Sequence, residues 1–207
     1  TCCVFLEILT NPQLEVADLK AISEVAHEKN VPLVVDSTVI PFTQFSAKSL
    51  GVDIEVVSSS KYVSGGATSL GGLVIDYGTP YNGDFAKRLY GEMLFNFGAY
   101  MTPQVAYMQT LGLETMSLRY EKATANCLEL VQLVAQFPEV ESVNYTGLPE
   151  NKYFELSTKQ FGERPGAMFT FNLSSCETCF SFMNKLKLVK RATNLFDNKT
   201  LAIHPAS

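Results

Sequence analysis

The chain has 207 residues, of which 46% are hydrophobic and 18% charged, a composition typical of a soluble globular protein with a real core. Its net charge of −5, with no clustered Lys/Arg face, argues against nucleic acid or an anionic membrane as a partner. No apolar run approaches the roughly 18 residues of a membrane span, and no signal-peptide pattern opens the chain.

Short apolar runs alternate with a helical pattern in the first hundred residues. Leu19, Ile22, Val25 and Ala26 recur at helical spacing after Asp18, a plausible cap, and predict a helix to about residue 29. Strands are predicted at residues 3–6, 32–36, 54–57 and 71–75. This alternation predicts an α/β fold, with an open, mostly parallel sheet and helices on both faces.

The second half has a different order. Residues 103–135 form one helical pattern, which Gly112 is expected to interrupt and whose length suits an element between two domains. The following pattern is α+β, with strands at 140–145 and 167–172, helices at 152–161 and 177–186, and short strands near 188 and 201. We therefore expect residues 1–102 to belong to a large domain. Residues 103–207 would form an inter-domain helix and part of a smaller C-terminal domain.

The cysteines indicate a reducing compartment, and we expect a cytoplasmic protein. Their odd number in a long chain does not resemble a secreted disulfide framework: Cys2, Cys3, Cys127, Cys176 and Cys179. Cys176 and Cys179 could hold zinc only with imidazole from His27 or His204, neither at finger spacing. Because Ser175 before the pair resembles a helix cap, we expect two ordinary thiols and no metal; metal or redox chemistry is the less favoured alternative.

Two polar residues stand at strand ends, where the crevice of an α/β sheet opens. Asp36 follows Leu33-Val34-Val35, and Lys61 follows Val56-Val57 and three serines. Taken singly, the aspartate is usually a cap and the lysine a solvated surface charge. Together they match pyridoxal 5′-phosphate, which needs a lysine amine and an acid opposite its pyridine nitrogen.

The residues around Lys61 suit a phosphate group. Ser58 and Ser60 supply hydroxyls beside the lysine, and backbone N–H groups in a tight turn would add further donors. Four glycines that follow would let the backbone pass close behind the site: Gly65, Gly66, Gly71 and Gly72. Their spacing and their place before a strand do not fit a dinucleotide fingerprint.

Several segments, in order, resemble the Cys/Met-metabolism family of pyridoxal-phosphate enzymes over essentially the whole chain. They are Glu7 to Pro12, Val34-Val35-Asp36-Ser37-Thr38, Val57-Ser58-Ser59-Ser60-Lys61-Tyr62, Phe97 to Pro103, Leu111 to Arg119, and Thr200 to Ser207. The resemblance implies a type-I pyridoxal-phosphate-transferase fold. It also implies a homo-oligomer, a dimer of dimers, with sites shared across the interface. Because the chain begins at Thr1, we expect a piece of a longer protein.

The resemblance also implies roles for the matching residues. Lys61 would form the Schiff base and shuttle protons, and Asp36 would pair with the pyridine nitrogen. Ser58 and Ser60 would hold the phosphate. Asn11 would hydrogen-bond the 3-hydroxyl of the cofactor ring.

The resemblance implies roles for two further residues, one of them in a segment that departs from the family pattern. Thr38 would pack against the ring face, and Asn194 lies in the segment that approaches the lysine and the substrate carboxylate. In that segment Phe196 stands where the family commonly has glycine. The family's stacking tyrosine and carboxylate-binding arginine lie outside a segment like this one, so Arg119 is expected to be a structural ion-pair member.

The resemblance is greatest to the O-acetylhomoserine sulfhydrylases within this family. It implies replacement of the acetyl group of O-acetylhomoserine by a sulfur donor, giving homocysteine or methionine in methionine biosynthesis. Methionine γ-lyase and cystathionine γ-synthase or lyase activities are the alternatives. A type-I-fold aminotransferase or desulfurase, which uses an Asp and a Lys in the same way, is a further alternative. The alternative from another class is a catalytically silent assembly module.

Overall fold

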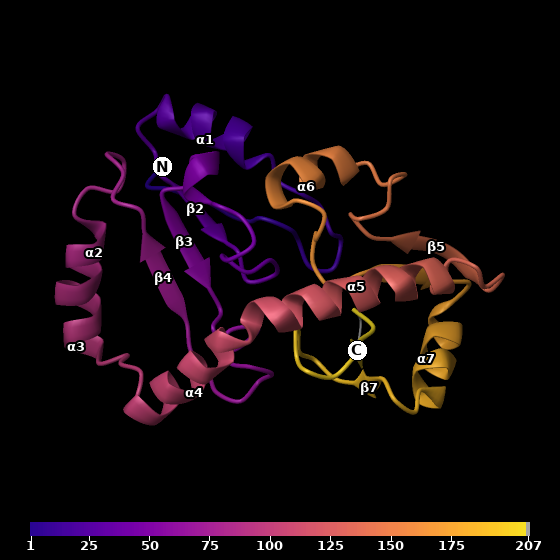
Figure 1. Ribbon diagram of the computed structural model, residues 1–207. Helices are drawn as coiled ribbons and strands as arrows, with labels where there is room; N and C mark the ends of the chain where they lie inside the picture. The colour runs from indigo at the N-terminus through magenta and orange to yellow at the C-terminus, as the bar shows by residue number, and fades with distance from the viewer. Residues whose placement is uncertain (206–207) are drawn as a thin grey trace.

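The computed structural model describes residues 1–205 and is built on a four-stranded sheet (Figure 1). Its strands lie side by side in chain order: β1 (Val4–Glu7), β2 (Leu33–Asp36), β3 (Ile54–Val57) and β4 (Leu73–Asp76). β1, β2 and β3 are parallel, whereas β4 pairs antiparallel with β3. The predicted α/β class with a mostly parallel sheet is confirmed.

The connections between the parallel strands bring their carboxyl ends to one edge. α1 (Leu19–His27) joins β1 to β2, and its cap is the predicted one, because Asp18 Oδ1 accepts the N–H of Ala21 at 3.1 Å. A single turn of 3-10 helix, η1 (Lys48–Leu50), interrupts the connection from β2 to β3 and ends at Gly51 in the left-handed region. The segments that follow β2 and β3 therefore emerge next to each other.

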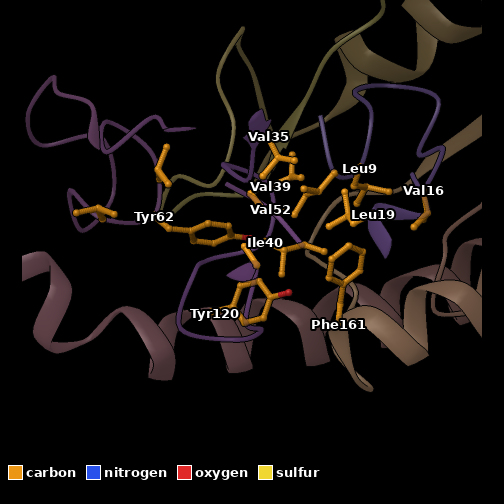
Figure 2. Packing of buried hydrophobic residues seen from close by; sticks show 14 of the residues in the cluster. Leu9, Val16, Leu19, Val35, Val39, Ile40, Val52, Tyr62, Tyr120 and Phe161 are labelled. Carbon is orange, nitrogen blue, oxygen red and sulfur yellow. The ribbon is translucent and has the colours of Figure 1, made fainter. Parts of the chain in front are cut away.

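The main core lies against one face of this sheet. Leu33 and Val35 belong to it while the intervening Val34 does not, because successive residues of a strand point to opposite faces. On the opposite face, Phe5 and Val74 are exposed. Figure 2 shows part of the cluster, drawn from the sheet, its connections and three helices: Leu9, Val16, Leu19, Val35, Val39, Ile40, Val52, Tyr62, Tyr120 and Phe161.

The second half begins with α4 (Pro103–Glu114) and α5 (Met116–Val134), which run across the molecule from the sheet to the smaller sheets (Figure 1). The elements after them follow the predicted order: β5 (Val140–Asn144), α6 (Phe154–Phe161), β6 (Thr170–Leu173), α7 (Cys176–Lys185), β7 (Lys190–Arg191) and β8 (Leu201–Ala202). β5 pairs antiparallel with β6, and β7 pairs parallel with β8. None of the helices in residues 1–205 is long and apolar enough to cross a membrane.

Two details differ from the sequence expectations. Residues 85–97 are helical, as α2 (Phe85–Arg88), a π-helical stretch η2 (Leu89–Leu94) and α3 (Phe95–Phe97), although no helix was predicted there. The break expected at Gly112 is wrong, since α4 continues through it and α5 begins only after Thr115. Gly112 instead permits close packing, because a Cβ there would lie 2.0 Å from the carbonyl oxygen of Val63.

Packing links the two halves of the chain. Met116 and Tyr120 of α5 and Phe161 of α6 belong to the same core cluster as the sheet. A second, smaller cluster centres on Cys127, Val131 and Tyr145. The division into domains at residues 102 and 103 stays a prediction.

Candidate active site

Asp36 and Lys61 lie at neighbouring strand ends. Asp36 is the last residue of β2, and its Cα partner on β3 is Val56. Lys61 follows β3 in a turn closed by its own N–H, which donates to the Ser58 carbonyl at 3.2 Å. Both side chains are half-buried, so each is held by the protein and still reachable.

Thr38 connects the aspartate to the serine turn. Its N–H donates to Asp36 Oδ1 at 2.9 Å, which fixes one oxygen of the carboxylate. Its hydroxyl oxygen accepts the N–H of Ser58 at 2.8 Å, from the other strand end. The sequence-predicted residues Asp36, Thr38 and Ser58 therefore form one hydrogen-bonded unit.

Asn194 meets Lys61 from the far end of the chain. Lys61 Nζ donates to Asn194 Oδ1 at 2.7 Å, across a separation of 133 residues. Sequence reasoning placed Asn194 in a segment that approaches the lysine, and the structure has this contact. The hydrogen bond aims the amine and leaves its remaining N–H groups or lone pair for chemistry.

Ser60 has a local role that the sequence did not reveal. Its hydroxyl donates to the Gly71 carbonyl at 3.2 Å and accepts the Gly71 N–H at 2.9 Å, so it closes the loop that leads into β4. Ser64 tightens the same turn, because its hydroxyl lies 3.0 Å from the Ser60 carbonyl and 3.1 Å from that of Lys61. Binding of a phosphate by Ser60 therefore stays a prediction, and it would compete with the hydrogen bond that the Ser60 hydroxyl donates to the Gly71 carbonyl.

Asn11 follows the strand that neighbours β2 on the side opposite β3. This strand is β1, whose last residue, Glu7, is the Cα partner of Asp36. The Asn11 N–H donates to Glu7 Oε2 at 3.3 Å, and Asn11 itself is exposed. Within residues 1–205 no hydrogen bond joins its side chain to Asp36 or Lys61, so its role towards the cofactor ring stays a prediction.

The glycines after Lys61 allow close approach at three positions of the four. A Cβ on Gly66 would lie 2.2 Å from the side-chain amide of Asn198, and one on Gly65 would lie 3.2 Å from the Cα of Gly112. A Cβ on Gly71 would lie 2.6 Å from the Ser59 hydroxyl. Gly72, by contrast, would make only an ordinary contact at 3.7 Å.

Arg119 does not form the expected ion pair with any residue that the structure describes. Its Nη2 instead donates to the carbonyl oxygens of Tyr62 and Gly112, each at 2.7 Å. These carbonyls leave the guanidinium without a counter-charge, and its burial lowers the pKa of Arg119. Arg119 thus fastens the end of α4 to the residue that follows Lys61.

Two aromatic residues beside the site were not assigned from the sequence. Tyr62 is 4% exposed, and burial raises its pKa well above the usual value. The ring of Phe196 stacks on it, with centroids 4.3 Å apart and planes 16° from parallel. The signal that could have found this contact was the replacement of the family's usual glycine at position 196.

A buried carboxylate lies beneath the strand ends. Glu55, in the middle of β3, is fully buried and accepts hydrogen bonds from the hydroxyls of Ser37 and Tyr77. Because Ser37 is the neighbour of Asp36, this network supports the strand end that carries the aspartate. Its sequence signal was a single charged residue inside an otherwise apolar strand.

The residues present fit pyridoxal 5′-phosphate by the chemistry of their donors and acceptors. Among the residues that the structure describes, Asp36 Oδ2 and the Ser58 hydroxyl have no hydrogen-bond partner. Asp36 Oδ2 can accept a hydrogen bond from a protonated ring nitrogen, and the Ser58 hydroxyl can donate one to a phosphate oxygen. The amine of Lys61 lies at the adjacent strand end.

The family model described as Cys/Met metabolism PLP-dependent enzyme matches residues 1–207. O-acetyl-L-homoserine sulfhydrylase 1 of Thermus thermophilus is 33% identical, over 98% of this chain and 55% of the relative. L-methionine gamma-lyase of Fusobacterium nucleatum subsp. nucleatum is 36% identical, over 100% of this chain and 52% of the relative. The chain thus spans about half the length of the curated relatives that it matches.

Solved structures of similar fold are also described as sulfhydrylases or thiol-lyases that act on O-acetylhomoserine. O-acetylhomoserine sulfhydrylase from Wolinella succinogenes matches with a TM-score of 0.85 and 42% identity, over 95% of this chain and 61% of that one. A putative O-acetylhomoserine (thiol)-lyase from Campylobacter jejuni has a TM-score of 0.94 and 30% identity, over 100% and 58% of the two chains. The latter structure carries N′-pyridoxyl-lysine-5′-monophosphate. The predicted fold class and the predicted cofactor are confirmed.

Proposed function

This chain belongs to the Cys/Met metabolism PLP-dependent enzymes, and we propose that the whole protein replaces the acetyl group of O-acetylhomoserine with a sulfur donor. The donor is sulfide or a thiol, and the product is homocysteine or methionine. The observation that carries the proposal is Lys61, aimed by Asn194 at 2.7 Å and placed beside Asp36 at neighbouring strand ends. Two similar proteins from different organisms, both O-acetylhomoserine sulfhydrylases, support this choice of reaction.

In this proposal four side chains would hold the cofactor at the strand ends. When bound, pyridoxal phosphate supplies an electron sink for the carbon that loses its proton. Lys61 would hold it through Nζ, and Asp36 Oδ2 would keep its ring nitrogen protonated. Thr38, which fixes the orientation of Asp36, would lie against the ring, and Ser58 would donate its hydroxyl to the phosphate.

Lys61 also moves protons in the proposed reaction. Once the amine of the substrate has replaced it on the cofactor, its Nζ would take protons from Cα and then from Cβ of the substrate, so that the γ-substituent can leave as acetate. It would return these protons as the sulfur donor adds at Cγ. Asn194 keeps the amine on one side of the turn, so that the proton travels a short, fixed path. The segment of Asn194 is also expected to approach the substrate carboxylate.

The first experiment measures acetate release. Full-length protein with O-acetylhomoserine and sulfide should release acetate in step with homocysteine, and Lys61→Ala should lose both this activity and the visible absorbance of bound cofactor. Lys20→Ala, on the exposed face of α1, is the matched control and should keep both. A coloured, folded wild-type protein that released no acetate with sulfide or with a thiol would contradict the proposed reaction.

Elimination from methionine is the second candidate, because an L-methionine gamma-lyase is 36% identical to the chain. It is favoured if methionine alone yields a thiol, a keto acid and ammonia faster than O-acetylhomoserine is consumed. Cystathionine as the preferred substrate would favour a cystathionine synthase or lyase. A full-length protein that binds no added cofactor would favour the silent assembly module.

We further propose a homo-oligomer, a dimer of dimers, in the cytoplasm. Large apolar side chains are exposed along residues 90–118, where they would be poorly matched to water: Tyr90, Met93, Phe95, Phe97, Tyr100, Met101, Tyr107, Met108, Leu111, Leu113 and Leu118. Burial of such a surface against another copy of the chain supports this assembly.

A further inference from the structure

Phe196 has an unusual backbone for its residue type. Its φ is +56°, in the left-handed region that glycine adopts freely and that a phenylalanine adopts only with strain. The strain persists because the surrounding contacts hold the residue in place. Phe196 is half-buried and packs against the main core cluster.

Alternate residues of the segment 194–198 contact the turn that carries Lys61. Asn194 accepts the hydrogen bond from Lys61 Nζ, and Phe196 stacks on Tyr62. Asn198 Nδ2 donates to the Gly65 carbonyl at 2.7 Å, in the space that the missing Cβ of Gly66 leaves. The stack is the central one of three contacts and the only apolar one among them.

Beyond these contacts the segment borders open space. A cavity of about 390 Å³ is lined by Tyr62, by residues of α5 and by residues 194–201. The chain is fixed again at Thr200, whose carbonyl accepts the N–H of Lys190 at 2.9 Å. Residues 194–198 before it are positioned in part by their contacts with the Lys61 turn. Tyr62 is a firm support for them, because it is buried and its carbonyl is bound by Arg119.

We propose that Phe196 is a positioning residue, whose stack on Tyr62 holds Asn194 at the distance from which it aims Lys61 Nζ. This proposal rests on the proposed function for the role of Lys61, but the contact itself is present without a cofactor. If the stack on Tyr62 decides where the segment lies, it also explains why Phe196 keeps a backbone conformation that phenylalanine disfavours.

The test compares variants of the full-length protein, first without cofactor. The readout is the rate at which an amine-reactive reagent labels Lys61, located by mass spectrometry of the peptides. Phe196→Leu removes the stack. Phe196→Gly removes the stack and also relieves the backbone strain, so we expect it to fold even if the leucine variant does not. Phe196→Tyr preserves the stack, and Phe182→Leu removes a different aromatic contact, the edge-on pair with Phe171.

We expect Phe196→Leu and Phe196→Gly to raise the labelling rate by about two- to tenfold, the range for loss of one hydrogen bond. Asn194→Ala should raise it at least as much, and Phe196→Leu combined with Asn194→Ala should raise it no further. The tyrosine variant and Phe182→Leu should match the wild type. Unchanged labelling in both position-196 variants, or a further rise in the double variant, would overturn the proposal.

The second readout is the circular dichroism of bound cofactor, which reports how firmly the cofactor is oriented. Phe196→Leu should weaken this signal, while Phe196→Tyr should restore it. If the wild type binds no cofactor, the proposed function fails, but the labelling comparison still decides the role of Phe196. If the cofactor binds and labelling follows no expected pattern, the positioning role fails and the proposed function stands.

Discussion

At the scale of single residues, the site depends on polar groups that are buried with their partners. Glu55 shows this most clearly, because a carboxylate in the middle of β3 is tolerated only with donors around it. Ser37 and Tyr77 are those donors. Burial and then the hydrogen bond to Glu55 raise the pKa of Tyr77, so its hydroxyl remains a donor throughout the physiological range.

Tyr77→Phe should therefore destabilise the protein. The substitution leaves one oxygen of Glu55 buried without its donor, and we expect a loss of about 1–3 kcal/mol in the free energy of unfolding. Urea unfolding measures the change, with Tyr90→Phe on an exposed ring as the matched control. If the two variants unfold at the same urea concentration, Glu55 does not depend on Tyr77.

A second residue-scale prediction concerns Cys127. Burial raises the pKa of its thiol from the ordinary value of 9.0 to about 12. A raised pKa favours the neutral form in the folded state, so the corresponding stability is complete below pH 9.0 and declines as the pH rises towards about 12. At about pH 8 an alkylating reagent should label the exposed Cys2 and Cys176 but not Cys127, and labelling of Cys127 in the folded protein would contradict this.

At the scale of elements, α1 is fixed by residues far apart in the chain. Asp18 caps it locally, as its sequence predicted. The first N–H of the helix, that of Leu19, donates to Gln160 Oε1 at 2.9 Å, and Gln160 Nε2 donates to the Ala17 carbonyl at 2.9 Å. A buried glutamine on α6 thus completes the start of a helix that lies 141 residues earlier.

Gln160→Ala should cost about 2 kcal/mol in the free energy of unfolding, because it leaves a buried N–H and a carbonyl without partners. Asp18→Ala should cost about 1 kcal/mol, the usual value for a lost N-cap. Thermal or urea unfolding measures both, and Gln132→Ala on an exposed face of α5 is the control. Equal stability of the Gln160 and Gln132 variants would show that α1 does not need the contact.

At the scale of the whole molecule, α4 and α5 bind the sheet to the smaller elements and expose much apolar surface. α5 contributes Met116 and Tyr120 to the main cluster and Cys127 and Val131 to the second. In α3, just before α4 in the chain, Phe95 and Phe97 lie outside both clusters and are 72% and 77% exposed. The proposed assembly would place this surface against another copy of the chain.

Phe95→Asp in the full-length protein should weaken that assembly. A charge in the centre of an apolar contact would lose its water without gaining a partner, so sedimentation should detect smaller species at the same concentration. Val25→Asp, at an exposed apolar residue of α1, should leave the assembly unchanged. Identical sedimentation of Phe95→Asp and wild type would place the interface elsewhere.

Local patterns by themselves determined the strands, most helices and the residues that carry the chemistry. Apolar runs, the Asp18 cap and the polar residues after Val35 and Val57 are short-range signals, because strand periodicity and capping depend on neighbours in the chain. The same patterns placed Asp36 and Lys61 at strand ends, and the structure shows that these two strands are neighbours. They missed the helical residues 85–97, whose exposed apolar side chains do not follow a single buried face.

Only the tertiary structure decided how distant segments meet at the site. Three contacts join residues far apart in the chain: the bond from Lys61 to Asn194, the stack of Phe196 on Tyr62 and the bond from Arg119 to the Tyr62 carbonyl. Such contacts depend on how packed elements place their side chains, and no local pattern encodes that geometry. Lys61 was therefore identified by the residues before it, whereas its orientation comes from the packing of the last segment against its turn.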